Sequence, residues 1–349
     1  MRLRANAGTD RTVAVFVGLA GLLALLPTLD LTIPGIFNGP LSSPGTIQVV
    51  GIGLVFAALA VSYDVLFGYT GLLSFGHALP FALGVYGTNL LMLRSGMDYL
   101  PAAVVTLVGV VAVSVVLGSV ALRTGGIAFA MVTLAFAESF SILVLTDPFR
   151  LFGGEEGLPL AVEHVPEAFR GVANVRNIYW LALSFLVGTF LVARRATTSR
   201  AGRVWEAIRE NEARVELLGL RPFVFKLAAF VLASGLAAGA GAIHLLLVRG
   251  ATAGVTTADF TLALLVMVVL GGPGRLWGAA IGGFVYGILT LRLSVVATSH
   301  VVASLPHWLA GPLSEPLFVL GVVFVLLVLF LPGGLVTLFD RLVGRLRRS

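Results

Sequence analysis

Ten apolar runs follow one another along this chain of 349 residues, and most are about 18–25 residues long. A helix of that length crosses the hydrocarbon core of a bilayer, where all backbone polar groups must be satisfied internally. Only 11% of the residues are charged, against about 25% in soluble domains. The sequence therefore predicts an all-α polytopic membrane protein with about ten transmembrane helices. The runs cover 12–29, 47–67, 71–93, 100–122, 126–145, 177–194, 223–247, 258–271, 276–293 and 315–332, of which the eighth is short.

The orientation of these runs follows from the placement of lysine and arginine, which gather in cytoplasmic loops. If the N-terminus is cytoplasmic, the inner segments hold 17 of the 23 basic residues, and the outer segments hold the other six. We therefore expect cytoplasmic N and C termini, a cytoplasmic loop over 195–222 and an external loop over 146–176. No clean cleavage site follows the first run, so we expect it to be retained as a span rather than removed as a signal peptide.

The cytoplasmic loop contains one strongly charged stretch, SRAGRVWEAIRENEARVELLGLRP, at 199–222. Its apolar residues fall 4, 7 and 3 apart, which predicts one face of an amphipathic helix. Gly219 can end that helix, and Pro222 follows as a stop signal. We expect a helix that docks on a cytoplasmic partner; the alternative is a helix lying in the lipid headgroups. The apolar face is Val204, Ile208, Val215 and Leu218, and the charged remainder is Arg203, Glu206, Arg209, Glu210 and Arg214, with Glu210 and Arg214 forming a favourable i,i+4 pair.

Glycine clusters interrupt two apolar runs, at 68–71 and 271–274. A shift of 200 positions aligns the two segments at Gly and Tyr positions, which suggests an internal repeat. Matching glycine-interrupted spans in two halves of a chain indicate a transporter's substrate path. We expect Gly71, Gly76, Gly271 and Gly274 to be structural.

Few polar residues lie inside the runs. Glu138 lies mid-span, where a carboxylate is costly and should face a cavity or a partner; both a structural role and a place on the translocation path are open. Ser74 and His77 are further candidates for the path, although His77 could instead bond a carbonyl group. Asp64, near the inner end of its run, is expected to be solvated or to cap a helix.

Several kinds of chemistry are missing from the sequence. There is no phosphate loop, and the single lysine, Lys226, has no glycine cradle. There are no cysteines, no metal-ligand spacing and no nucleophile–base set, so we expect neither a catalytic site nor a metal site. The basic residues form no single basic face, which argues against nucleic acid as a partner.

Three motifs carry a family resemblance, at 63–86, 202–250 and 270–289, with a weaker fourth, FGGEEGLPL, at 152–160. Together they resemble the permease subunits of branched-chain amino-acid ABC importers, although the first 46 residues match nothing in that pattern. The resemblance implies one transmembrane permease domain over 1–349 in a prokaryotic cell (inner or plasma) membrane, with residues 202–219 as a coupling helix in an ATPase groove. It implies a second permease, two ATP-binding subunits and an extracytoplasmic solute-binding protein as partners. The chain itself would bind no cofactor, because ATP and Mg²⁺ would sit on the ATPases.

Other functions stay open. Related systems carry urea or amides, so the motifs do not fix the cargo. An ion-coupled secondary carrier, with Glu138 as its proton or sodium site, would act without other subunits. A membrane enzyme is the third class, and no catalytic set in the sequence favours it.

Overall fold

The structure is a computed structural model that describes residues 16–32, 39–297, 315–330 and 333–337. Both chain termini lie outside the described residues, so their predicted cytoplasmic placement stays a prediction. The helices are Phe16–Thr28, α2 (Pro44–Asp64), α3 (Ala78–Ser95), α4 (Tyr99–Ala121), α5 (Ile127–Thr146), α6 (Val175–Thr197), α7 (Arg200–Glu210), α8 (Glu212–Leu217), α9 (Pro222–Val248), α10 (Ala258–Gly271), α11 (Leu276–Ala297) and α14 (Pro316–Phe330). Shorter elements are η1 (Leu26–Thr28), the π-helical turn η2 (Val65–Tyr69), η3 (Gly154–Glu156), η4 (Val162–His164), η5 (Glu167–Phe169) and η6 (Ala253–Thr256), with strands β1 (Leu158–Pro159) and β2 (Gly250–Ala251).

Each of the ten predicted runs falls on a helix, but the predicted number of spans is not confirmed. Within the described residues, six helices are long and apolar enough to cross a membrane. The helix Phe16–Thr28, α10 and α14 are shorter, and α3 contains Asn89 and Arg94. The six spans are Pro44–Tyr69, Tyr99–Ala121, Ile127–Thr146, Val175–Thr197, Pro222–Val248 and Leu276–Leu293.

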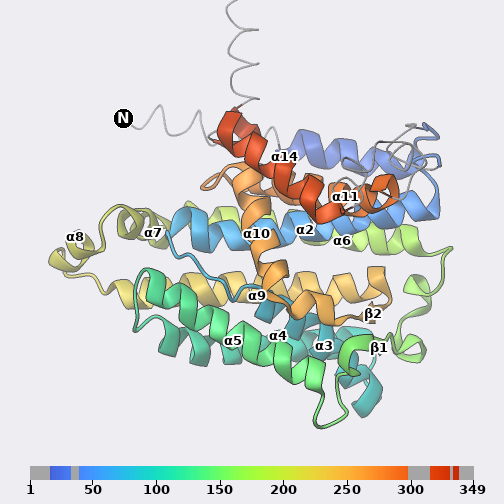
Figure 1. Cartoon of the computed structure of the whole chain (residues 1–349), viewed down its shortest axis with the longest axis horizontal. Helices are drawn as coiled ribbons and strands as arrows, with labels where there is room; N and C mark the ends of the chain where they lie inside the picture. Colours follow the sequence, from blue (N-terminus) through green and yellow to red (C-terminus); the bar gives the residue numbers. More distant parts are fainter. Residues whose placement is uncertain (1–15, 33–38, 298–314, 331–332, 338–349) are drawn as a thin grey trace, which may run out of the picture.

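Helix α2 is the centre of the bundle. It packs against α6, α9 and α11, and nearly all of its residues are buried. Helix α9 joins this core to α3 and α4, while α10 runs steeply across the other helices (Figure 1). The outer side of α4 carries exposed valines and leucines, as expected of a helix that faces lipid.

The third run begins later than predicted, because residues 71–77 are not helical. The turn η2 ends at Tyr69, and Gly71, two residues later, takes a positive φ of 72°. The chain then passes through an irregular segment, and α3 starts at Ala78. The left-handed conformation of Gly71 thus turns the chain away from the axis of α2.

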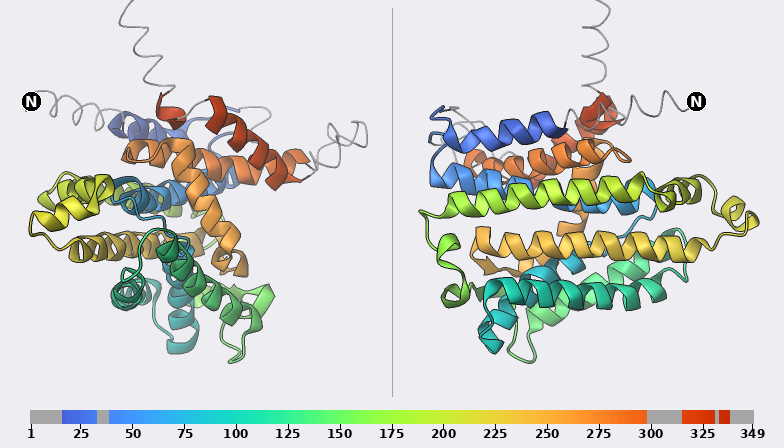
Figure 2. Two further views of the ribbon diagram at one scale, coloured as in Figure 1. Left: turned by 60° about the vertical axis from the view of Figure 1, so that its left-hand side comes forward. Right: turned by 180° about the vertical axis from the view of Figure 1, so that it is seen from behind.

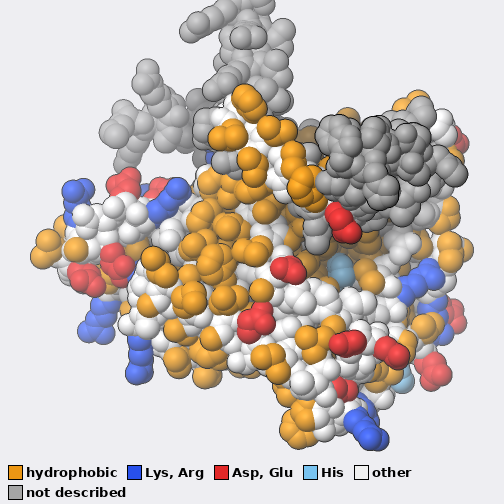
Figure 3. Space-filling model, viewed as in Figure 1, with side chains coloured by type: hydrophobic (Ala, Val, Ile, Leu, Met, Phe, Trp, Pro, Cys, Tyr) orange, Lys and Arg blue, Asp and Glu red, His pale blue; other side chains and the backbone are white. Residues whose placement is uncertain are grey.

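The predicted cytoplasmic and external loops lie at opposite ends of the bundle. Helices α7 and α8 protrude from one end, here called the α7–α8 end (Figure 2). The segment between α5 and α6 lies at the other end, where β1 pairs antiparallel with β2. On the face shown in Figure 3, basic side chains lie toward the two ends, and the surface between them carries hydrophobic side chains with a few acidic ones. This distribution fits a bundle that crosses a bilayer along its long axis.

The segment between α5 and α6 is ordered by two side chains. The Asn89 amide donates to the Pro159 carbonyl at 2.9 Å and accepts from the Ala161 N–H at 3.2 Å. The Asp147 carboxylate accepts three backbone N–H groups, from Leu151, Phe152 and Gly153, at 2.7–3.0 Å. Because these bonds fix the loop on α3 and on the end of α5, it presents a defined surface.

Candidate functional site

The α7–α8 segment begins with a tight corner after α6. Ser199 caps α7 by accepting the Gly202 N–H at 3.3 Å. A Cβ atom on Gly202 would lie 1.9 Å from the Thr197 carbonyl oxygen, so only glycine fits this close approach. The corner therefore fixes the direction in which α7 leaves the bundle.

The prediction of a single helix over 199–219 is wrong, because the structure breaks it at Asn211. Asn211 has an extended backbone, with φ −162° and ψ 103°, and its side chain caps α8 by accepting the Arg214 N–H at 3.0 Å. Asparagine favours such a cap because its short side chain reaches the backbone N–H groups left free at a helix start. Glu210 and Arg214 thus lie on different helices, and the predicted i,i+4 pair is absent from the described structure. The predicted end holds: Gly219 has φ 80°, and α9 begins at Pro222.

The apolar side of α7–α8 faces this chain, which corrects the prediction that it presses on a partner. Ile208 and Val215 are 5% and 2% exposed. Trp205, which the sequence interpretation missed, is 2% exposed, and its indole N–H donates to the Phe225 carbonyl at 2.8 Å. Leu218, assigned to the same face, is 74% exposed. Burial of the tryptophan and isoleucine thus holds α7 against α9 and the end of the bundle.

The outer side of α7–α8 is charged, and its tip is apolar. Leu217 and Leu218 at the tip are 89% and 74% exposed. An ion pair between Lys226 of α9 and Glu212, with Nζ and Oε1 2.5 Å apart, fixes the start of α8. The predicted coupling residues Arg203, Glu206, Arg209, Glu210 and Arg214 are all exposed. Exposed leucines rimmed by charge on a rigid projection form a surface suited to a protein partner.

Arg209 points back to the first glycine break. Its guanidinium group donates a hydrogen bond to the Gly68 carbonyl in η2. Asp64, one residue before η2, accepts the backbone N–H of Gly274 at 2.7 Å. Asp64 is fully buried, so the expectation that it is solvated is wrong. The structure thus brings α7 and both glycine-interrupted segments to one point, here called the glycine junction and consisting of Asp64, Gly68, Arg209 and Gly274.

Gly274 belongs to this junction, and the other three predicted structural glycines lie in the segments 71–77 and 271–274. Gly71 and Gly274 have positive φ values of 72° and 79°. A Cβ on Gly76 would lie 2.4 Å from the Thr133 carbonyl oxygen, and one on Gly271 would lie 2.0 Å from that of Gly278. Each position therefore has a steric reason for glycine. The internal repeat itself stays a prediction.

Ser74 and His77 belong to a buried polar cluster between α2 and the start of α3. The His77 Nε2 atom lies 3.0 Å from the Ser62 hydroxyl oxygen. The Tyr63 hydroxyl donates to the Ser74 carbonyl at 2.9 Å. These bonds tie the irregular segment 71–77 to α2; a role of Ser74 and His77 on the translocation path stays a prediction.

Glu138 lies on α5, far from the glycine junction in sequence. Its side chain is half-buried, and no hydrogen bond or ion pair joins it to the described residues. The Ser139 hydroxyl bonds to Ala135, and that of Ser141 bonds to Thr256. Neither serine therefore satisfies the Glu138 carboxylate.

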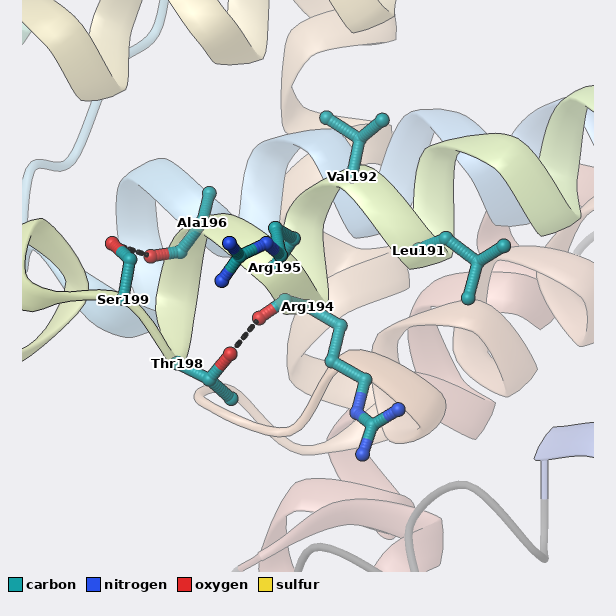
Figure 4. Close-up of a pocket in the computed structure, with 7 residues that line it drawn as sticks. All are labelled: Leu191, Val192, Arg194, Arg195, Ala196, Thr198 and Ser199. Atoms are coloured by element: carbon teal, nitrogen blue, oxygen red, sulfur yellow. Dashed lines mark hydrogen bonds between the residues drawn. The ribbon is translucent and has the colours of Figure 1, made fainter.

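A hollow of about 810 Å³ flanks the last turns of α6 (Figure 4). It is lined by Leu191 and Val192 and, one turn further on, by Arg194 and Arg195. Figure 4 shows the Thr198 hydroxyl bonded to the carbonyl of Arg194 at 2.7 Å. Apolar residues followed by arginines at a helix end are typical of the membrane–water boundary. Within the described part of the chain, no three acidic or histidine side chains come together as a metal site would require.

Comparisons with known proteins identify a family and several relatives of this chain. The family described as "Branched-chain amino acid transport system / permease component" matches residues 45–331. The high-affinity branched-chain amino acid transport system permease proteins LivM of Escherichia coli (strain K12) and Salmonella typhimurium (strain LT2) are 29% and 30% identical over 66% of this chain. A probable branched-chain amino acid transport permease protein LivM of Methanocaldococcus jannaschii is 25% identical over 81% of this chain and 90% of its own length.

The chain covers 60% of the length of the Escherichia coli and Salmonella relatives. No solved structure matches the chain. The family match extends from the start of α2 to the end of α14 and includes the α7–α8 segment and both glycine breaks. This multi-pass membrane protein therefore belongs to the family of permease components of branched-chain amino acid transport systems.

Proposed function

We propose that this chain is a transmembrane subunit of an ATP-driven importer of branched-chain amino acids in a prokaryotic cell membrane. It forms the translocation path together with a second permease subunit. Two cytoplasmic ATP-binding subunits supply the energy, and an extracytoplasmic solute-binding protein delivers the cargo. The chain itself has no catalytic role, and ATP and Mg²⁺ are bound by the ATPase subunits.

The rigid attachment of α7–α8 is the observation that carries this proposal. Trp205, Arg209 and Glu212 each bond to a different part of the bundle, at Phe225, Gly68 and Lys226. A segment held in this way moves with the spans to which it is attached. Its exposed tip and charged outer side form a surface to which a separate subunit can bind. The names of the relatives, which are permeases of branched-chain amino acid systems, support the cargo class.

The segment between α5 and α6 offers a second partner surface, at the end of the bundle opposite α7–α8. Its ordered turns carry the exposed side chains Glu155, Glu156, Glu163 and Glu167. We assign this acidic surface to the solute-binding protein, because fixed surface charge steers the approach of a partner of opposite charge.

Reconstitution tests the proposal. The chain is co-expressed with a candidate second permease, ATPase subunits and a solute-binding protein from the same genome, and the purified complex is placed in liposomes. We expect uptake of radiolabelled L-leucine that requires ATP, the binding protein and both permeases. Uptake by this chain alone, driven by an ion gradient, would instead establish a secondary carrier. Uptake of urea or an amide in place of leucine would change the cargo and leave the ATP-driven mechanism in place.

A further inference from the structure

Glu138 is the acidic side chain near mid-depth among the described spans. It lies 8 residues before the end of α5, which is roughly 12 Å along the helix axis from Thr146. The hydrocarbon core is about 30 Å thick, so the carboxylate lies well inside it. Asp64 by contrast is fully buried at the end of α2, and Asp259 lies in the first turn of α10.

The side of α5 that carries Glu138 is less bulky beside the carboxylate than further along the helix. Ala135 and Ser139, the exposed side chains next to Glu138, are small, whereas Met131 and Ile142 are large and apolar. The exposed side of α4 by contrast carries mostly valines and leucines, such as Val104, Val108 and Val116. We call the first surface the α5 outer face; it consists of Met131, Ala135, Glu138, Ser139 and Ile142.

Helix α5 is tied beside this face to the segment that leads into α10. The Thr256 hydroxyl in η6 donates at 3.1 Å to the hydroxyl of Ser141, a buried residue one turn from Glu138, and α10 begins two residues after Thr256. Acidic side chains lie among hydrophobic ones on the surface formed by α5 and α10 (Figure 3). A half-exposed carboxylate at this depth requires a cation or donors from outside the described chain, because lipid tails offer neither.

We propose that Glu138 is part of the cargo site and that its carboxylate binds the primary ammonium group of an α-amino acid as it passes along the α5 outer face. This inference rests on the proposed function. An α-amino acid must give up the hydration of its ammonium group inside the membrane, and a carboxylate is the side chain that replaces those hydrogen bonds best. The small side chains of Ala135 and Ser139 leave space beside Glu138 for the cargo.

The test uses the reconstituted complex with Glu138→Gln, Glu138→Asp and the matched control Ser184→Ala. Ser184 is an exposed polar residue in α6, outside the α5 outer face, and its hydroxyl donates to the Leu181 carbonyl within that helix. We expect Glu138→Gln to slow ATP-driven L-leucine uptake by about tenfold or more, as for the loss of one charged hydrogen bond. The Asp variant should retain part of the rate, and Ser184→Ala should transport like the wild type. Co-purification of all subunits should not change in any variant.

Three results would overturn this inference, and they point to different causes. Wild-type uptake by Glu138→Gln would show that the carboxylate does not meet the cargo. Loss of the second permease from purified Glu138→Gln would show that Glu138 instead pairs with that subunit. If the wild-type complex itself takes up no amino acid, the proposed function fails first, and the cargo assignment fails with it.

Discussion

The carboxylate of Asp64 accepts a hydrogen bond from the backbone N–H of Gly274, with 2.7 Å between Oδ1 and the nitrogen. The two residues are 210 positions apart: Asp64 lies four residues before the first glycine break, and Gly274 is the last residue of the second. Asp64 is fully buried, and its second oxygen has no partner among the described residues. The Arg209 charge interacts with it electrostatically. The coupling segment and both breaks thus meet at one buried carboxyl group, and Arg209 of α7 places a cation near it.

Gly68→Ala tests how tightly the junction is packed. An added Cβ would lie 1.9 Å from Asp64 Oδ1 and 2.4 Å from the Gly274 nitrogen, so the Asp64–Gly274 bond has to break. We expect a loss of about 1–3 kcal/mol in the free energy of unfolding, seen as a lower thermal midpoint of the purified protein. The control is Gly109→Ala in α4, where an added Cβ meets open space. Equal midpoints for the two variants would contradict the packing.

Arg209→Met tests whether the junction transmits movement. The variant removes the bond to Gly68 and the charge near Asp64, while Trp205 still holds α7 on α9. We expect the ATPase subunits to remain bound and to hydrolyse ATP, whereas L-leucine uptake falls by about tenfold or more, as expected when a buried charge loses its partner. The comparison is Arg203→Met on the outer side of α7, which should weaken ATPase retention instead. Normal uptake by Arg209→Met would show that the glycine junction takes no part in coupling ATP hydrolysis to transport.

The helices could be predicted because the membrane imposes a long apolar run on each of them. All ten runs fall on helices, and α10 matches its predicted bounds of 258–271. The break at Asn211 could not be predicted from periodicity, since the apolar spacing continues across it. The capping preference of asparagine was the signal that could have revealed it.

The sequence also could not predict that the apolar side of the coupling segment is buried against its own chain. An amphipathic helix shows which side is apolar but not whether that side meets its own chain or another. Trp205, the largest apolar residue of α7, was the available signal that the inner side is used. The prediction that Asp64 is solvated was wrong because its partner is the backbone N–H of Gly274, from a distant segment. Every residue type except proline has this donor, so the sequence does not reveal it.

A comparison of inner and outer substitutions tests the orientation of α7–α8. Ile208→Asp places an unpaired charge at a position that is 5% exposed, which we expect to destabilise the isolated chain by about 3–5 kcal/mol. Leu217→Ser with Leu218→Ser changes two exposed side chains, so stability should change by less than about 0.5 kcal/mol per site. The double variant should nevertheless lose the ATPase subunits during purification. Retention of the ATPases by this variant would show that the tip is not the docking surface.

The turn after α5 offers a test that depends on pH. Desolvation opposes ionisation of Asp147, but hydrogen bonds from the backbone N–H groups of Phe152, Leu151 and Gly153, with the charge of Arg94, hold its pKa below the usual value. A carboxyl group with a lowered pKa stabilises the folded turn above its ordinary pKa of about 3.9, and this stabilisation is lost as the pH falls through the lower value. Amide protection at 151–153, measured by hydrogen exchange and corrected for intrinsic rates, should therefore decrease as the medium is acidified below about pH 4.

Asp147→Asn separates this charge effect from backbone shape. Asp147 has a φ of 38°, a conformation that asparagine tolerates well, so the turn itself is retained. The amide has one acceptor oxygen where the carboxylate has two, and it carries no charge for Arg94. Protection at 151–153 should thus be lower at pH 7 and should no longer change on acidification. Asp98→Asn is the matched control, because Asp98 makes no side-chain bond at the start of α4. A pH dependence that persists in Asp147→Asn would mean that another group controls the loop.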